Sequence, residues 1–168
     1  MQTVVCRAIR SKPGLLYSLC FVLSLYLLVG CSAHQTQVVP PVKGITLEQA
    51  ELLKVHQEWQ GTPYRLGGDS KSGIDCSAFV QQLYISAYHK QLPRTTEAQM
   101  RQGKAIRLAE AKTGDLIFFK TSRKVRHVGV IYDQQYFLHA STSKGVIFSR
   151  LDNVYWSPKI IAINRPSL

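Results

Sequence analysis

The feature that most constrains the fold is a change in hydrophobic spacing near Ala105. Before it, apolar residues recur at helical spacing in three segments. After it come five short segments typical of strands: 116–119, 125–132, 136–140, 146–150 and 160–163. Because the connections are short, neighbouring strands are expected to be antiparallel. Helices followed by a meander of strands predict an α+β domain, with N-terminal helices packed on a C-terminal antiparallel sheet.

Each predicted helix carries a start signal. Thr46 and Gln49 form a capping-box pattern, and one helical face follows, made of Leu52, Val55, His56 and Trp59. Asp75 is a good N-cap, which makes Cys76 the first residue of the second helix. The third helix is expected over residues 95–102, between a proline and a glycine.

The N-terminus has the layout of an export signal. A basic cluster precedes an uncharged apolar run, residues 15–29, that is shorter than the roughly 20 residues needed to span a bilayer. A short transmembrane anchor is the alternative. The sequence Leu28-Val29-Gly30-Cys31 resembles the lipobox of bacterial lipoproteins, which implies that Cys31 is acylated and becomes the new N-terminus.

The chain is therefore expected to have three parts: a lipoprotein signal peptide over 1–30, a lipidated tether over 31–45, and a catalytic domain over 46–168. Ser32 after the acylated cysteine implies an exported protein, lipid-anchored in the cell envelope at the periplasmic face of the outer membrane. Acylation at Cys31 by several chains would hold the protein firmly on that membrane.

Charge narrows the class of partner. Removing residues 1–30, which contain three basic and no acidic residues, lowers the formal charge from +11 to +8. A basic mature chain suits an anionic surface, such as lipid headgroups or an acidic cell-wall polymer. The basic residues are scattered and no nucleic-acid motif is present, so a nucleic-acid partner is not expected.

Cys76 is the best candidate for a catalytic nucleophile. The chain has four cysteines, of which Cys6 and Cys20 lie in the predicted signal and Cys31 in the lipidation pattern. A lone remaining cysteine, with histidines elsewhere in the chain, is a candidate nucleophile. At the first turn of a helix, unpaired N–H groups and the helix dipole favour the thiolate. A buried structural cysteine is the alternative.

His127 and His139 lie on neighbouring predicted strands. A three-residue turn at 133–135 places Gly129 opposite His139, so that the two imidazoles become diagonal neighbours on one face. A two-residue turn would put them on opposite faces. We expect the odd-length turn, with both histidines facing the helix that begins at Cys76.

A cysteine and two imidazoles supply a nucleophile, a base and an orienting group. Zinc is an alternative, because one Cys and two His are zinc ligands, but the chain offers no close-spaced ligand pair and no fourth ligand. The other histidines, His34, His56 and His89, are assigned to the tether, a helix surface and a helix end.

The catalytic pattern resembles the NlpC family of cell-wall cysteine peptidases, within the papain-like superfamily. The resemblance covers residues 47–168, and the lipoprotein N-terminus fits members of that family. It rests on six segments: Gly61-Thr62-Pro63-Tyr64-Arg65-Leu66-Gly67-Gly68, Gly73-Ile74-Asp75-Cys76-Ser77-Ala78-Phe79-Val80, Leu92-Pro93-Arg94-Thr95, Gly114-Asp115-Leu116-Ile117-Phe118-Phe119, His127-Val128-Gly129-Val130-Ile131-Tyr132 and Phe137-Leu138-His139-Ala140-Ser141.

The resemblance implies a papain-like fold and a Cys–His–His triad. Cys76 is then the nucleophile, His127 the general base and His139 the orienting residue. The family cleaves amide bonds in the peptide stems of peptidoglycan, which implies a cysteine endopeptidase that acts through a thioester acyl-enzyme. No metal or organic cofactor is required for this reaction, and a monomer is expected.

The resemblance also suggests residues around the triad. Tyr64 matches a tyrosine whose hydroxyl lies near the thiolate and assists the oxyanion site; a packed loop aromatic is the alternative. Asp75 and Ser77 match positions that line the substrate groove in some relatives, and helix capping is their alternative. Ala78 and Leu66 depart from the family pattern, which bears on groove shape.

Two other functions stay open at this point. One is a cell-wall-binding lipoprotein without hydrolytic activity. The other is an amidase or acyltransferase on the same fold.

Overall fold

The computed structural model describes residues 38–41 and 44–167. The predicted signal peptide, Cys31 and most of the tether lie outside these residues. Over the part that is described, no helix is both long enough and apolar enough to cross a bilayer.

Three helices lead the domain: α2 (Leu47–Trp59), α3 (Cys76–Tyr88) and α4 (Thr96–Met100). The capping box of α2 is present, because the Thr46 hydroxyl accepts from the Gln49 N–H and the Gln49 side chain accepts from the Thr46 N–H. Asp75 caps α3, as expected, and His89 ends it in the left-handed conformation. The helix α4 is shorter than predicted: Thr95 is its N-cap, and it ends before Arg101.

The main sheet has six strands in the order β3-β8-β4-β5-β6-β7, with every neighbouring pair antiparallel. Their bounds are β3 (Lys104–Ala105), β4 (Leu116–Lys120), β5 (Arg126–Ile131), β6 (Tyr136–Ser141), β7 (Gly145–Arg150) and β8 (Ile160–Arg165). A separate two-stranded ribbon, β1 (Asp69–Ser70) with β2 (Gly73–Ile74), precedes α3. Short 3-10 helices, η1 (Leu108–Glu110) and η2 (Ser157–Lys159), lie before β4 and β8.

The expected meander holds only from β4 to β7. The last strand, β8, does not extend it; instead it returns to pair with β4 on the opposite edge, and β3 pairs with β8. The prediction of a simple meander was therefore wrong, because hydrophobic alternation identifies a strand but not its partner. The mixed architecture itself, helices with an antiparallel sheet, is confirmed.

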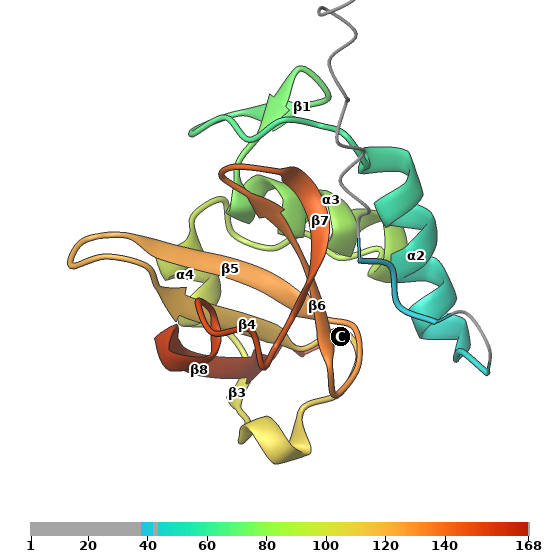
Figure 1. Cartoon of the computed structure of the whole chain (residues 1–168), viewed down its shortest axis with the longest axis vertical. Helices are drawn as coiled ribbons and strands as arrows, with labels where there is room; N and C mark the ends of the chain where they lie inside the picture. Colours follow the sequence, from blue (N-terminus) through green and yellow to red (C-terminus); the bar gives the residue numbers. More distant parts are fainter. Residues whose placement is uncertain (1–37, 42–43, 168) are drawn as a thin grey trace, which may run out of the picture. The chain divides into compact units, whose positions relative to one another are not determined.

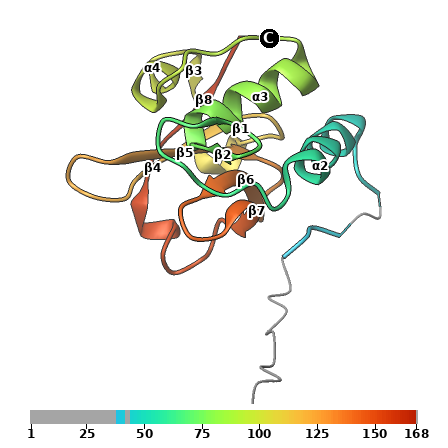
Figure 2. The ribbon, with the colours of Figure 1, turned by 90° about the horizontal axis from the view of Figure 1, so that it is seen from above.

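Alternate residues of the central strands pack into two different cores. On one face, Val128 and Val130 of β5 join a large cluster with α3 residues such as Phe79 and Leu83. Figures 1 and 2 show α3 lying against β5 and β6. A smaller cluster, on the other alternation of the same strands, contains Ile117, Phe119, Ile131 and Phe137, with Trp156 packed against it.

His56 does not lie on the surface of α2. It is 2 % exposed, its ring packs on Phe148 of β7 at a centroid distance of 4.7 Å, and burial lowers its pKa. The assignment to a helix surface was therefore wrong. Helical spacing places His56 on the same apolar face as Leu52, Val55 and Trp59. Residues on that face are buried together, so the spacing predicts a buried His56.

Candidate active site

The β5–β6 hairpin places the two histidines together. The register pairs Val130 with Leu138, which confirms the three-residue turn and puts both imidazoles on one face of the sheet. The His127 Nε2 and His139 Nδ1 atoms are 2.8 Å apart, with the rings almost perpendicular at 88°. Both side chains are buried, at 4 % and 0 % exposure.

Gly129 makes this arrangement possible. A Cβ atom at this position would lie 2.7 Å from Cδ2 of Phe137 and 3.2 Å from the Cβ of His139. Real Cβ atoms do not approach a packed ring so closely, so a larger residue would push the β6 side chains away. Gly129 thus allows the β5 backbone to lie close to β6 beside the histidine pair.

The histidines do not face α3, contrary to the prediction. Helix α3 packs on Val128 and Val130, which alternate with His127, so the imidazoles belong to the opposite face of the sheet. The alternation of residues along β5 predicts two different faces, but its sequence does not indicate which of them α3 covers.

The Cys76 sulfur lies at the β5 backbone next to His127, at the point where the ladder between β5 and β6 has ended. The ladder between these strands covers only Ile131–Phe137 and Val130–Leu138. Along β5, the N–H groups of every second residue point to the same neighbouring strand. Since the Tyr132 N–H donates to the Tyr136 C=O, the Val128 N–H also points towards β6. The β5–β6 ladder ends at Val130 and does not include Val128. The Val128 N–H interacts with the Cys76 sulfur instead of a β6 carbonyl, and this interaction favours the charged form of the thiol.

The Cys76 side chain is 5 % exposed at the first residue of α3. Its sulfur lies 3.6 Å from Oγ1 of Thr96, a contact that sequence reasoning missed. Among the described residues, no hydrogen bond joins this sulfur to His127. In enzymes without substrate such contacts are often long and tighten on binding.

The thiol is not acidic, contrary to the expectation drawn from its place on α3. Burial raises the pKa of Cys76, and the opposing hydrogen bonds from the Thr96 hydroxyl and the Val128 and Ser77 N–H groups do not outweigh it. The Asp75 charge raises the pKa further. Desolvation of a thiolate thus exceeds the benefit of the helix start, and the resting sulfur is a neutral thiol.

The imidazoles are neutral as well. Burial lowers the pKa of His127 to about 4 and lowers that of His139 well below its usual value, with the neighbouring His127 adding to the effect. A neutral imidazole is able to accept a proton, which an imidazolium is not. The resting pair therefore has the protonation state of a base.

Two further residues complete the surroundings of the pair. Ser149 of β7 places its Oγ 2.8 Å from His139 Nε2. Trp156 stacks on His127 at 5.1 Å and meets His139 edge-on at 5.0 Å. Sequence reasoning missed both. The alternation of β7, with Val146 and Phe148 in the large core, was the available signal for Ser149; for Trp156 there was none.

The Asp75 carboxylate caps the start of α3 and also lines the cleft at Cys76, as does Ser77. It accepts from the N–H groups of Gly67 and Ala78, from the Ser77 hydroxyl and twice from Arg94, the last at 2.7 and 2.9 Å. Burial acts to raise the Asp75 pKa, but these hydrogen bonds outweigh it and lower the pKa. With both oxygens occupied and 6 % exposure, Asp75 acts as a cap, and Ser77 is a member of the same network.

Tyr64 is half-buried on the segment before the β1–β2 ribbon, where its backbone bridges to Ile74. Burial, with smaller effects from the Cys76 and Asp75 charges, raises the pKa of Tyr64 to about 12. Its hydroxyl therefore stays protonated at neutral pH and is available as a hydrogen-bond donor.

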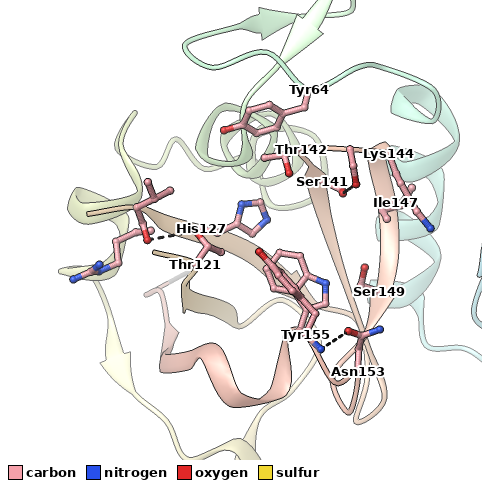
Figure 3. A pocket seen from close by; sticks show the side chains of 14 residues that line it. Tyr64, Thr121, His127, Ser141, Thr142, Lys144, Ile147, Ser149, Asn153 and Tyr155 are labelled. Atoms are coloured by element: carbon pink, nitrogen blue, oxygen red, sulfur yellow. Dashed lines mark hydrogen bonds between the residues drawn. The ribbon is translucent and has the colours of Figure 1, made fainter. Parts of the chain in front are cut away.

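Two adjacent clefts lie at the site. The Cys76 cleft, about 540 Å³, is lined by Cys76 together with residues of the α3 and α4 starts. The His127 cleft, about 460 Å³, lies next to the Cys76 cleft and is lined by residues of β5, β6 and β7 and by Trp156. Tyr64, Val125 and Arg126 line both clefts, so the two are adjacent. Figure 3 shows the His127 ring between Tyr64 and Tyr155.

Within the part of the chain that the structure covers, no group of three or more His, Cys, Asp and Glu side chains is arranged to hold a metal. In addition, the His127 Nε2 and His139 Nδ1 atoms are hydrogen-bonded to each other, and His139 Nε2 is hydrogen-bonded to the Ser149 hydroxyl. These contacts suit proton transfer.

A buried thiol at a helix start, beside a hydrogen-bonded histidine pair on an antiparallel sheet, defines the class of the papain-like cysteine peptidases. Residues 61–165 match the NlpC/P60 family. The chain belongs to this family and is a cysteine peptidase.

Individual relatives agree with this assignment. The chain is 42 % identical over 134 residues to a "Probable endopeptidase" of Haemophilus influenzae, covering 79 % of this chain and 81 % of that protein. It is 40 % identical over 111 residues to "Murein DD-endopeptidase MepS/Murein LD-carboxypeptidase" of Escherichia coli K12, covering 66 % of this chain and 59 % of that one.

Solved structures share the fold. A Staphylococcus aureus protein described as similar to lipoprotein, NLP/P60 family, superposes with a TM-score of 0.63 at 27 % identity. The match covers 86 % of this chain and 47 % of that chain.

Proposed function

We propose that the protein is a peptidoglycan endopeptidase that hydrolyses amide bonds of stem peptides through a thioester on Cys76. The observation that carries the proposal is the histidine pair, 2.8 Å apart, beside a thiol that lines a groove. The murein endopeptidase name of the Escherichia coli relative supports peptidoglycan as the substrate class.

The hydrogen bonds of the histidine pair indicate which nitrogen of His127 is free to accept a proton. If Ser149 accepts from the His139 Nε2–H, then His139 Nδ1 accepts from the His127 Nε2–H. His127 Nδ1 is then free of a proton and is able to take the one on Cys76. Ser149 and His139 are positioning residues in this scheme, because each acts on the reaction through its neighbour.

In the first half of the reaction, the Cys76 proton moves to His127 as the sulfur attacks the amide carbonyl carbon. The oxyanion is held by N–H groups at the start of α3 and by the Tyr64 hydroxyl; one such donor contributes about 3 kcal/mol. The C–N bond then breaks, and the His127 imidazolium gives its proton to the leaving amine.

In the second half, neutral His127 takes a proton from water, which attacks the thioester. The carbon–sulfur bond breaks, the stem peptide leaves as a carboxylic acid that ionises in solvent, and His127 returns its proton to Cys76. Since the resting thiol and imidazole are both neutral, proton transfer between them accompanies attack.

Digestion of defined muropeptides tests the activity. The wild-type protein should release stem fragments, and Cys76→Ser should release none above background. Mass spectrometry of the products distinguishes an endopeptidase from an amidase, which would separate sugar from peptide, and from an acyltransferase. Undiminished hydrolysis by Cys76→Ser would refute the proposal.

The membrane anchor is a second part of the proposal. Acylation of Cys31 after removal of residues 1–30 would fix the domain to the periplasmic face of the outer membrane, near its substrate. The proposal is supported by the lipobox-like sequence at 28–31. Cys31→Ser should move the protein from the membrane fraction to the soluble fraction; an unchanged distribution would contradict it.

A further inference from the structure

We propose that Thr96 is a further catalytic residue, whose hydroxyl donates a hydrogen bond to the Cys76 sulfur once that sulfur becomes a thiolate. The inference rests on the proposed function, because it concerns the same nucleophile. It adds a group that neither the histidine pair nor the start of α3 supplies: a side-chain hydroxyl from a second helix, which stabilises the thiolate before attack.

The contact between Thr96 and Cys76 joins the starts of two helices. Thr96 is the first residue of α4, and its Oγ1 lies 3.6 Å from the sulfur of Cys76, the first residue of α3. Both residues are buried, at 6 % and 5 % exposure, so little water competes for the sulfur. Among the residues that the structure describes, the Thr96 hydroxyl has no other hydrogen-bond partner, and its one proton is available to the sulfur.

The position of Thr96 is fixed by residues on both sides of it. Gln99, one helical turn further along α4, is fully buried, and its Nε2 donates to the Ser77 carbonyl at 3.0 Å. Before α4, the Arg94 guanidinium pairs with the Asp75 carboxylate at 2.7 Å. The α4 segment is therefore tied to both residues that flank the nucleophile, which keeps the hydroxyl beside the sulfur.

The hydroxyl acts against the effect that keeps the sulfur neutral. Burial raises the pKa of Cys76, and the Thr96 hydroxyl is the strongest of the groups that lower it, ahead of the N–H groups of Val128 and Ser77. A hydrogen bond to an ionised group is stronger than one between neutral groups, so this contact stabilises the thiolate more than the thiol. It therefore lowers the free energy needed to move the thiol proton to His127.

Thr96 keeps its own proton throughout the reaction. As the Cys76 proton moves to His127, the negative charge that develops on the sulfur accepts the hydrogen bond from the Thr96 hydroxyl. When the carbon–sulfur bond forms, this charge passes to the carbonyl oxygen, and the hydrogen bond to sulfur weakens. Thr96 thus acts on thiolate formation, whereas the N–H groups of α3 and the Tyr64 hydroxyl act on the oxyanion.

Alkylation of the full-length protein by iodoacetamide tests the inference without a substrate, with mass spectrometry of the peptide that carries Cys76. Thr96→Val keeps the size of the side chain and removes the hydroxyl. Its alkylation rate at neutral pH should be about tenfold lower than that of the wild type, and its pH profile should move up by about one unit, as expected for one hydrogen bond to a charged group. Thr96→Ser keeps the hydroxyl and should restore most of the rate.

Thr113→Val is the matched control. It removes a hydroxyl that donates to the Tyr132 carbonyl and does not line the Cys76 cleft, so it should keep the wild-type rate and pH profile. The titratable and charged groups around the sulfur are the same in all these proteins, so a moved profile reports on the hydroxyl. They are His127 and the groups that line the Cys76 cleft, namely Tyr64, Asp75, Arg94, Glu97, Lys124 and Arg126.

An unchanged rate and profile in Thr96→Val would overturn the inference, as would a rate in Thr96→Ser as low as that of Thr96→Val. A higher KM for muropeptides with unchanged alkylation would also overturn it, because Thr96 would then bind substrate. If Thr96→Val does not fold, Thr96→Ala, which adds no atoms to the core, is measured in its place. If the wild type cleaves no muropeptide while the loss of the hydroxyl still slows alkylation, the proposed function fails and the inference holds.

Discussion

The two faces of the β5–β6 hairpin perform different tasks with alternate residues of the same strands. One face carries Val128 and Val130, which pack under α3 in the large apolar core. The other carries His127 and His139, which lie among aromatic rings and form polar contacts. In the proposed mechanism, α3 therefore supplies the nucleophile from one side of the sheet and the strands supply the base from the other, where the β5–β6 ladder ends.

The largest effect should separate the two faces directly. His127→Asn should lower kcat/KM about a thousandfold, because general-base catalysis contributes on that order, while the free energy of unfolding changes little. Val130→Ala, on the α3 face, should lower the free energy of unfolding by about 2 kcal/mol with kcat/KM kept within a few-fold. Kinetics and urea denaturation of both variants measure this. Equal losses of activity would show that the faces are not distinct.

Gly129→Ala should disturb the histidine face through packing. The added Cβ lies too close to Phe137 and to the Cβ of His139, so the β6 side chains must shift. A displacement of about 1 Å in a catalytic group lowers activity by about a hundredfold. Steady-state kinetics measure the loss, and Ala140→Gly, on the α3 face of β6, is the control that changes a small residue without displacing His139. Wild-type activity in Gly129→Ala would contradict the account.

The buried histidines should make stability depend on pH. The folded-state pKa of His127 is about 4, below its unfolded value of 6.5, so the unfolded chain binds more protons between these values. Stability is therefore fully present above pH 6.5 and is lost as the pH falls towards 4, by about 1–2 kcal/mol for one such histidine between pH 7 and 5. Urea denaturation at each pH measures this. A free energy of unfolding that stays constant over this range would be inconsistent with neutral, buried imidazoles.

The smallest effect should come from Ser149. Ser149→Ala removes the acceptor at His139 Nε2 and should lower kcat about fivefold, the size of a single hydrogen bond. Ser149→Thr keeps the hydroxyl and should restore most of the activity. A purely structural role would instead lower the free energy of unfolding in both variants without this difference in kcat.

Much of the site could be predicted because local rules decide it. Asp75 before an apolar helical segment fixes Cys76 at a helix start, and an odd-length turn fixes the histidine register. Gly129 was recognisable from its place beside the pair.

Other features depend on tertiary packing, which one sequence does not reveal. Alternation along β5 does not tell which face α3 covers, so the histidines were assigned to the wrong side. The thiol pKa depends on burial, which opposes the helix start and exceeds it. Trp156 reaches His127 from the segment between β7 and β8, and β8 itself pairs with β4 rather than β7.

The central claim is that His127 takes the proton of Cys76 where the β5–β6 ladder ends. The rate of Cys76 alkylation by iodoacetamide tests it most directly, because the neutral thiol must lose its proton to a base as it is alkylated and no substrate is needed. At neutral pH, the wild-type rate should fall by at least about tenfold in His127→Asn, and both proteins should react alike at a pH high enough to ionise the thiol without a base. An equal rate in the two proteins at neutral pH would contradict the account.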